Sequence, residues 1–240
     1  MKQTLTLLRK ELASYFNSPI AYIVVIFFLV FTSVWFFYIQ QFVAQDVASL
    51  RNYFAIFPIV FIILLPAVTM RSWAEENKIG TVELLLTLPF RAGQTVAGKF
   101  LGAFSLLVIT LALTIPVPLT IAPLGDFETG QIVGQYLGVL LLGAAGLSIG
   151  LFISSLSRNQ ITAFILSAVV LLFLTLINQV NFLVDLPEWL GFVFNYLSLD
   201  YHFSSFEKGL VDSRDLVFYL ALAALFLYLN TKVLVFRKWR

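Results

Sequence analysis

The sequence predicts an all-α membrane protein, a single transmembrane domain of residues 1–240 with six transmembrane helices. Hydrophobic residues make up 60% of the 240 residues and charged residues only 12%, which is about half the charged fraction of an ordinary soluble domain. Six apolar segments come close to or exceed the roughly 18 residues that a helix needs to cross a bilayer. Their hydrophobicity is continuous rather than alternating, which excludes an outer-membrane β-barrel.

The first 18 residues precede the first apolar segment and combine apolar and basic side chains at helical spacing. Leu5, Leu8 and Leu12 recur along one helical face, and Lys2, Arg9 and Lys10 supply positive charge. This pattern predicts a helix lying on the inner leaflet, with a disordered basic tail as the alternative. Ser18 and Pro19 predict a capped helix start for the first span.

The six apolar segments cover residues 20–38, 54–69, 99–121, 132–156, 161–180 and 216–235. The first is too long for a cleaved signal peptide, so we expect it to stay as a membrane anchor. The second is expected to continue into the polar residues 71–79. Pro116 and Pro118 predict that the third kinks or ends early. The middle of every segment lacks ionisable residues, which argues against proton relays, ion-coupled carriers and intramembrane proteases.

The basic residues predict the orientation in the membrane. With the N-terminus in the cytoplasm, only Arg51, Lys208 and Arg214 of the 15 Lys and Arg residues fall outside. Cytoplasmic loops carry the excess of Lys and Arg in membrane proteins. We therefore expect a multi-pass protein of the cytoplasmic (inner) membrane with both termini in the cytoplasm.

The connection formed by residues 71–90 is charged and amphipathic, unlike the short turns elsewhere on the cytoplasmic side. Gly80 divides it, and Thr81 is placed to cap a short helix over residues 82–88, with Glu83 in its first turn. The second half carries more apolar residues than a solvated loop tolerates: Leu84, Leu85, Leu86 and Leu88. These leucines need a cover, either the inner leaflet or a groove on another protein.

Glycines follow two patterns that bear on packing. Gly93 to Lys99 resembles a phosphate-binding loop, but Phe100 stands where Ser or Thr should bind magnesium and no strand precedes it, so we expect no nucleotide site. Gly98 and Gly102 instead favour close helix packing. The fourth segment repeats small residues every four positions, at Gly134, Gly138, Gly146, Gly150 and Ser154, which indicates close packing within one protomer or at a dimer seam.

The outer connection, residues 181–215, is too apolar for a free loop and predicts short helices dipping into the outer leaflet. One is expected to end at Gly209, and Asp212 with Asp215 can cap the last span. His202 is the single histidine. It could act as a switch or ligand, but without a second His or a Cys we expect a polar residue at the membrane interface.

The residues exclude most catalytic chemistry. Without cysteine, and with one histidine, the chain cannot form disulfides, thiolate zinc sites, iron–sulfur clusters or a Ser-His-Asp set. We therefore expect no catalytic residue, no cofactor site and no metal site in this chain, and a protein that is not an enzyme.

Three motifs carry a resemblance to a known family. They are Lys10-Glu-Leu-x-Ser-Tyr-Phe-x-Ser-Pro-Ile-Ala-Tyr22, Arg71-x-x-x-Glu75-Glu-x-Lys-x-Gly80-Thr-x-Glu83-Leu-Leu-x-x-Leu-Pro89 and His202-Phe-x-x-Phe-x-x-Gly209-x-x-Asp-x-Arg-Asp215. With them, the whole chain resembles the six-span permease subunits of ABC exporters of the second export class, and within that class the gliding-motility branch.

The resemblance implies a set of structural parts and partners. The parts are an N-terminal elbow helix over residues 4–16, a cytoplasmic coupling helix over residues 71–88, and short outer helices over residues 186–208. Two copies of a separate ABC ATPase would bind ATP and magnesium and drive a pair of permeases, identical or related, in the membrane lipid. An extracytoplasmic accessory protein is a further partner of such exporters. No nucleic acid is implied.

The resemblance also assigns residues. The ATPase-coupling residues are Arg71, Glu75, Glu76, Lys78, Gly80, Thr81, Glu83, Leu84, Leu85 and Leu88. A translocation path between spans two and five would be lined by Phe57, Phe61, Phe164, Phe173 and Asn178, an aromatic surface suited to a lipid-like or amphipathic substrate. Ordinary helix packing is the competing explanation for these five residues. The competing function is an ATP-independent membrane scaffold or a channel-like protein.

Overall fold

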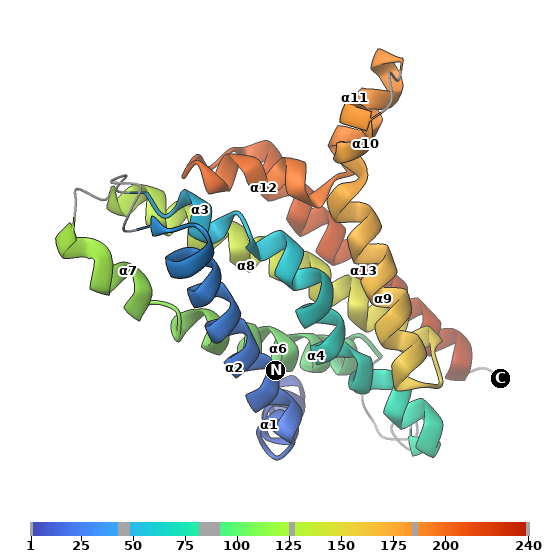
Figure 1. The fold of residues 1–240 in the computed structure, drawn as a ribbon. Coiled ribbons are helices and arrows are strands. Elements are labelled where there is room, and N and C mark those ends of the chain that lie inside the picture. Colours follow the sequence, from blue (N-terminus) through green and yellow to red (C-terminus); the bar gives the residue numbers. More distant parts are fainter. Residues whose placement is uncertain (1, 43–48, 82–91, 125–127, 184–186, 239–240) are drawn as a thin grey trace.

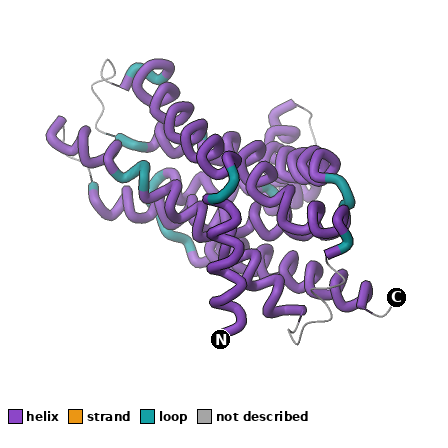
Figure 2. The backbone as a smooth tube through the Cα atoms, turned by 90° about the horizontal axis from the view of Figure 1, so that it is seen from below, coloured by secondary structure: helices purple, strands orange, loops and turns teal. Residues whose placement is uncertain are grey.

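The computed structural model describes residues 2–42, 49–81, 92–124, 128–183 and 187–238, and within these ranges all regular structure is helical (Figures 1 and 2). Six stretches are long and apolar enough to cross a membrane: Pro19–Ile39, Arg51–Ile79, Ala92–Ile121, Thr129–Leu156, Gln160–Gln179 and Ser213–Phe236. Each overlaps one predicted segment, so the expectation of six spans is confirmed by length and composition.

The N-terminal half begins with α1 (Lys2–Phe16), so these residues do not form a disordered tail. Ser18 then caps α2 (Pro19–Val34) by accepting from the Ile20 amide, with Pro19 at the first helical position as predicted. α2 continues into a π-helical turn, η1 (Trp35–Ile39). The short α3 (Arg51–Phe54) leads to α4 (Phe57–Ile79), which runs through residues 71–79 as expected and ends where Gly80 adopts φ +79°.

The third span is broken, as its prolines predicted. α6 (Ala92–Ala112) ends before Pro116, and α7 (Pro116–Ile121) with the 3₁₀ turn η3 (Ala122–Leu124) completes it. α8 (Thr129–Leu156) and α9 (Gln160–Leu176) are joined by a three-residue turn in which Asn159 caps α9.

The C-terminal half then runs through short elements at the end of α9. These are η4 (Ile177–Gln179), α10 (Val180–Leu183), α11 (Glu188–Leu197) and α12 (Leu199–Glu207), followed by the last span, α13 (Ser213–Lys238). The expected short helices of the outer connection are therefore present.

α4 and α8 form the centre of the bundle (Figure 1). In the most apolar window of each of these spans, 72% of the residues are buried, against 28% in the first and fifth spans and 17% in the last. The peripheral helices therefore present most of their apolar surface outward, as expected of a protein whose solvent is lipid.

The small-residue pattern of α8 serves packing inside the protomer. A Cβ at Gly138 would lie 2.3 Å from Phe206 Cβ, one at Gly146 would lie 2.3 Å from a Leu65 methyl group, and one at Gly150 would meet Thr69 Oγ1. α8 thus packs closely against α12 along one stretch and against α4 along another. Of the two explanations for the small-residue pattern, packing within one protomer is therefore the one that these contacts support. Gly98 and Gly102 of α6 do the same against Leu7 and Glu11 of α1, as predicted.

The elements that the sequence assigns to the cytoplasmic and the outer side lie toward opposite ends of the bundle. The end of α4, the α8–α9 turn and the end of α13 lie together, and α3, the start of α8 and α12 lie toward the opposite end (Figure 1). At that opposite end Arg51 Nε of α3 lies 2.7 Å from Glu207 Oε1 of α12, which links these two elements.

Two expectations for the outer connection need correction. Asp212 does accept from the Arg214 amide at the start of α13, but Asp215 takes no part in the cap and pairs with His202 instead. His202 is 2% exposed, because α12 folds it against α13, so it is a buried residue rather than an interfacial one.

Candidate functional site

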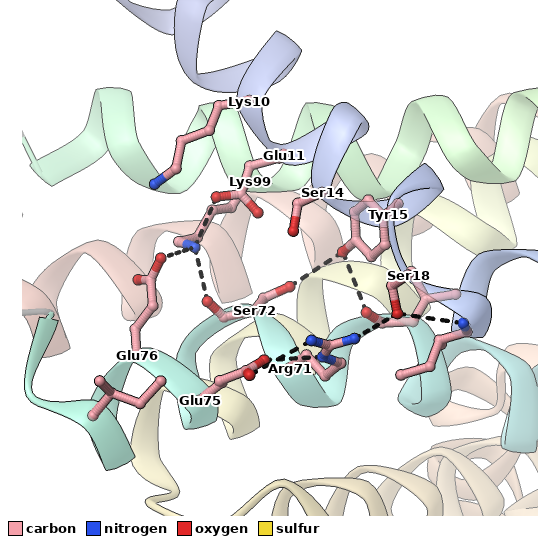
Figure 3. A pocket seen from close by; sticks show the side chains of 13 residues that line it. Lys10, Glu11, Ser14, Tyr15, Ser18, Arg71, Ser72, Glu75, Glu76 and Lys99 are labelled. Carbon is pink, nitrogen blue, oxygen red and sulfur yellow. Dashed lines mark hydrogen bonds and ion pairs between the residues drawn. The ribbon is translucent and has the colours of Figure 1, made fainter.

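The C-terminal half of α4 is the candidate site, because it leads directly into the charged connection that the sequence singled out. Its turns bury Ser72, Trp73 and Ala74 and expose Lys78 and Ile79. The helix can extend past the apolar segment because its polar residues are met by side chains of α1, of α6 and of Ser18, the N-cap of α2 (Figure 3). On its other side they are met by Ser154 of α8.

Lys99 of α6 is the central contact of this site. Its ammonium group donates to Glu11 Oε1 of α1 at 2.9 Å, to Glu76 Oε1 of α4 at 2.8 Å and to the Ser72 carbonyl at 2.8 Å. The three donors of the ammonium group thus meet three acceptors. Lys99 is 2% exposed, and its Nζ lies 4.8 Å from the centre of the Trp73 ring, which adds a cation–π contact. One side chain therefore ties three helices together.

Arg71 makes the second cross-connection, one turn earlier on α4. Its Nε lies 2.9 Å from Glu75 Oε2, and its NH1 donates to Ser18 Oγ at 2.6 Å. Tyr15 OH donates to the Val68 carbonyl at 3.2 Å and lies 3.2 Å from Ser72 Oγ. Burial raises the pKa of Tyr15, an effect that the Ser72 hydrogen bond partly offsets. The junction of α1 and α2 is thereby fixed to α4.

α8 holds the opposite side of α4. Ser154 Oγ accepts from the Trp73 and Ala74 amides, each at 3.2 Å, and donates to the Met70 carbonyl. Asn77 Nδ2 donates to the carbonyls of Ser155 and Ser157, at 3.2 and 2.8 Å. The end of α4 is therefore held by polar contacts on two opposite sides.

A cleft of about 290 Å³ opens between α1, α4 and α6. Its charged lining residues are Lys10, Glu11, Arg71, Glu75, Glu76 and Lys99. Because three cations face three carboxylates, the cleft has no strong preference for an anion or a cation. The cleft is the open edge of the polar contacts between α1, α4 and α6.

The structure places six of the ten predicted coupling residues. Lys78 is exposed, and Gly80 ends α4; Thr81 Oγ1 turns back to the Glu76 carbonyl at 3.5 Å. Arg71, Glu75 and Glu76 point into the junction. Glu76 Oε1 accepts from buried Lys99, and Glu75 pairs with Arg71. Glu83, Leu84, Leu85 and Leu88 lie outside the described residues.

Sequence reasoning did not identify the side chains that contact the polar residues at the end of α4. Glu11, Tyr15 and Ser18 lie more than fifty positions before the polar turns of α4, and Lys99 was considered only as part of the pattern that resembles a phosphate-binding loop. The available signal was its place between Gly98 and Gly102, since a lysine on a close-packed helix face must find buried acceptors.

The five predicted path residues do not share one surface in this protomer. Phe57 and Phe61 are 0% and 2% exposed and lie in the aromatic core, with ring centres 5.1 and 6.1 Å from that of Phe28. Phe173 is 59% exposed on α9, whereas Phe164 is half-buried. Asn178 is buried and donates to Asp200 at 3.4 Å. Packing within the protomer is sufficient to explain the buried positions of Phe57 and Phe61.

No cluster of three or more His, Cys, Asp or Glu side chains that could hold a metal ion occurs among the described residues. The site consists of ion pairs and hydrogen bonds between helices. Such an arrangement can position and transmit movement, but it supplies no reactive group.

Comparison with known proteins agrees with the six spans and with the family that the motifs suggested. The model of a family described as ABC-2 family transporter protein matches residues 38–206, which is well over half of the chain. No curated protein matches the sequence. The match covers the second to fifth spans and the end of α4. The chain therefore belongs to the ABC-2 transporter family, as a multi-pass membrane permease subunit.

Proposed function

We propose that this permease is the membrane half of an ATP-driven exporter, and that residues 71–90 receive a separate ATPase subunit. The observation that carries the proposal is the junction around Lys99, which binds the end of α4 to α1 and α6 immediately before the predicted docking segment. A scaffold has no need for such a braced helix end at one charged connection.

The mechanism follows from how the contacts are shared. A displacement of the segment after Gly80 pulls on the end of α4, and the ammonium group of Lys99 and the hydroxyl of Ser154 link that end to α1, α6 and α8. Close-packed helices move as rigid bodies rather than deform continuously. ATPase closure would therefore shift four helices together instead of bending one.

The docking contact itself is assigned to the leucines of the segment. Leu84, Leu85 and Leu88 would be buried anchors in a groove of the ATPase. Register and polar contacts would come from Glu75, Glu76, Lys78 and Glu83, because interface charges give specificity more than affinity. In the full complex we infer two ATPase copies carrying ATP and magnesium, a second permease subunit and, as a further partner, an extracytoplasmic accessory protein.

The substrate class proposed is lipid-like or amphipathic, carried outward across the inner membrane with both termini of the permease in the cytoplasm. The exposed apolar face of α9, which includes Val169, Leu172 and Phe173, would form one side of the path. Phe57 and Phe61 are enclosed in this protomer, so they would reach the path only when α4 moves away from α2.

The test is a pull-down of the ATPase with the Leu84→Ala/Leu85→Ala permease, with ATP turnover measured in parallel. Burying one leucine contributes about 1.5–3 kcal/mol, so the double change weakens docking roughly a hundredfold or more by the affinity relation. Leu210→Ala, at an exposed position beyond α12, is the matched control and leaves binding unchanged.

Undiminished ATPase binding together with unchanged turnover would rule out this docking role. It would leave the leucines as contacts with the inner leaflet. A permease that never co-purifies with an ATPase would favour the alternative of an ATP-independent scaffold or channel-like protein.

A further inference from the structure

The ion pairs inside the cleft between α1, α4 and α6 leave one negative charge over. Lys99 is the shared partner of two carboxylates, Glu11 at 2.9 Å and Glu76 at 2.8 Å, so these three residues together carry one negative charge. Glu76 Oε2 is buried and has no hydrogen-bond partner among the described residues. Glu11 also lines the cleft, and its second oxygen has no partner among the side chains drawn in Figure 3. That oxygen is therefore placed to accept from a cation that enters the cleft.

One positive charge is also left over, on Lys10 of α1. Its ammonium group lines the cleft without an ion-pair partner among the described residues (Figure 3). Ser14, one turn further along α1, lines the cleft as well. From α4, Arg71 uses three of its five N–H donors on Glu75 and Ser18, and the others remain for a further acceptor. These donors can bind an anion beside the place for the cation.

The two leftover charges define the chemistry of the ligand. A basic cleft between membrane helices would favour an anionic head group, but here an anion alone would leave the negative charge of the Lys99 group unmatched. A ligand that carries both signs matches both places. The carboxylate of Glu11 requires a hydrogen-bond donor, which a primary ammonium group supplies and a trimethylated one does not. The cleft therefore fits a primary ammonium group joined to a phosphate.

The apolar part of the cleft indicates that such a ligand comes from the bilayer. Ile20 of α2 and Val68 of α4 line the cleft and belong to membrane-spanning helices. Ile23 and Phe27 follow Ile20 on the same face of α2 and are 63% and 45% exposed, so a hydrocarbon chain can lie along them. The cleft of about 290 Å³ is no larger than the smallest pockets that enclose a drug-sized ligand, ~300–1,000 Å³, which suits a head group but not a whole phospholipid.

We propose that this cleft binds the head group of a phospholipid of the phosphatidylethanolamine type, taken from the leaflet on the α1 side of the bundle. The ammonium group donates to Glu11 and offsets the charge of Glu76, while the phosphate accepts from Lys10, Ser14 and Arg71. The acyl chains lie along α2. This inference concerns a lipid bound to the permease and depends neither on ATPase docking nor on the exported substrate.

Native mass spectrometry of the full-length, delipidated permease tests the head-group preference. The protein is titrated with three lipids that have identical acyl chains: phosphatidylethanolamine, phosphatidylcholine and phosphatidylglycerol. Phosphatidylcholine keeps the charges but has no N–H, and phosphatidylglycerol has no cation. Because hydrogen bonds to charged groups are among the strong ones, we expect the first phosphatidylethanolamine to bind roughly tenfold more tightly than either of the others.

Two variants locate the binding in the cleft. Lys10→Met removes the cation that faces the phosphate and should weaken phosphatidylethanolamine binding roughly tenfold. Arg9→Met is the matched control, since Arg9 is the exposed neighbour that does not line the cleft, and it should leave binding unchanged. Glu11→Gln keeps an oxygen for Lys99 but removes the leftover negative charge, so the preference should change to phosphatidylglycerol. Thermal unfolding of each variant verifies that it is folded.

Three results would overturn the proposal. They are equal affinity for phosphatidylethanolamine and phosphatidylcholine, tightest binding of phosphatidylglycerol by the wild type, and equal losses in Lys10→Met and Arg9→Met. Soluble phosphoethanolamine is added as a competitor to distinguish the bilayer from the solution as the source of the ligand. We expect it to displace the lipid only at a large excess. Displacement at a concentration equal to that of the lipid would assign the cleft to a soluble zwitterion and refute the lipid site.

Discussion

Replacing Lys99 by Met removes the ammonium group while keeping most of the side-chain volume. Glu11 and Glu76, at 12% and 18% side-chain exposure, then lose the ammonium group that both contact. Breaking a buried ion pair by removing one partner costs about 3–5 kcal/mol. Because both carboxylates keep some access to water, we expect the lower part of this range, about 3 kcal/mol.

The assay is thermal unfolding of the purified permease in detergent. For a chain of this size, 1 kcal/mol shifts Tm by about 2–4 °C, so Lys99→Met should melt roughly 6–12 °C below the wild type. Trp73 lies against Lys99, so in a variant whose other three tryptophans are replaced by Phe its fluorescence reports the loss of this junction. Lys10→Met, on the exposed side of α1 beside the same cleft, is the control and should change Tm by less than about 2 °C.

A triple variant separates two causes of the lower Tm, the lost attraction of Lys99 for its partners and the unpaired charge left on Glu11 and Glu76. Lys99→Met/Glu11→Gln/Glu76→Gln removes the uncompensated carboxylates, and at least half of the lost Tm should return, since the stranded charges carry most of the cost. If Lys99→Met melts within about 2 °C of the wild type, Lys99 does not brace α4 and the reasoning fails.

Three further predictions test the packing, the burial and the orientation. Gly138→Ala drives a methyl group into α12 and should cost about 1–3 kcal/mol in thermal unfolding, whereas Gly130→Ala, with nothing within 4 Å of the added carbon, should be neutral; equal effects would refute the close α8–α12 contact. Because burial raises the pKa of Tyr15, the native state resists ionisation that the unfolded chain undergoes near pH 10, so stability falls above about pH 10. Tyr15→Phe should lose less stability than the wild type above pH 10, and an equal loss in the two proteins would contradict the raised pKa of Tyr15. In this cysteine-free chain, Glu128→Cys should react with an impermeant thiol reagent from outside intact cells and Arg158→Cys should not; the reverse pattern would invert the topology.

The spans could be predicted from sequence because they depend on local properties. A continuous apolar run, the Ser18–Pro19 start and the Gly80 stop act within a few residues, and each appears in the structure where it was expected. The packing role of Gly98 was also foreseeable, since a small residue on an apolar helix serves few other purposes.

The functional junction could not be predicted in the same way. Glu11, Glu76 and Lys99 are separated by up to 88 positions, and nothing in their local surroundings shows that they share one ammonium group. The surroundings of the aromatic residues could not be predicted for a related reason. Phe57 lies on a central helix, and which face of such a helix meets another helix is decided by tertiary packing, not by its own apolar pattern.

His202 was misjudged because its partner was given another role. Asp215 fits a capping position by its spacing from Asp212, and only the fold of α12 onto α13 shows that it serves the imidazole instead. A motif whose residues were recognised as a set thus contained a pair that spacing alone could not reveal.

Site-specific photo-cross-linking tests the central claim, that an ATPase acts on the end of α4. A photoreactive amino acid is placed at Ile79, which is 66% exposed at the end of α4, and for comparison at Val133, which is 68% exposed near the start of α8 at the opposite end of the bundle. The account predicts that position 79 cross-links an ABC ATPase subunit in membranes and that nucleotide changes the yield, while position 133 captures none. An ATPase captured from position 133, or none captured from position 79 in a complex that hydrolyses ATP, would contradict it.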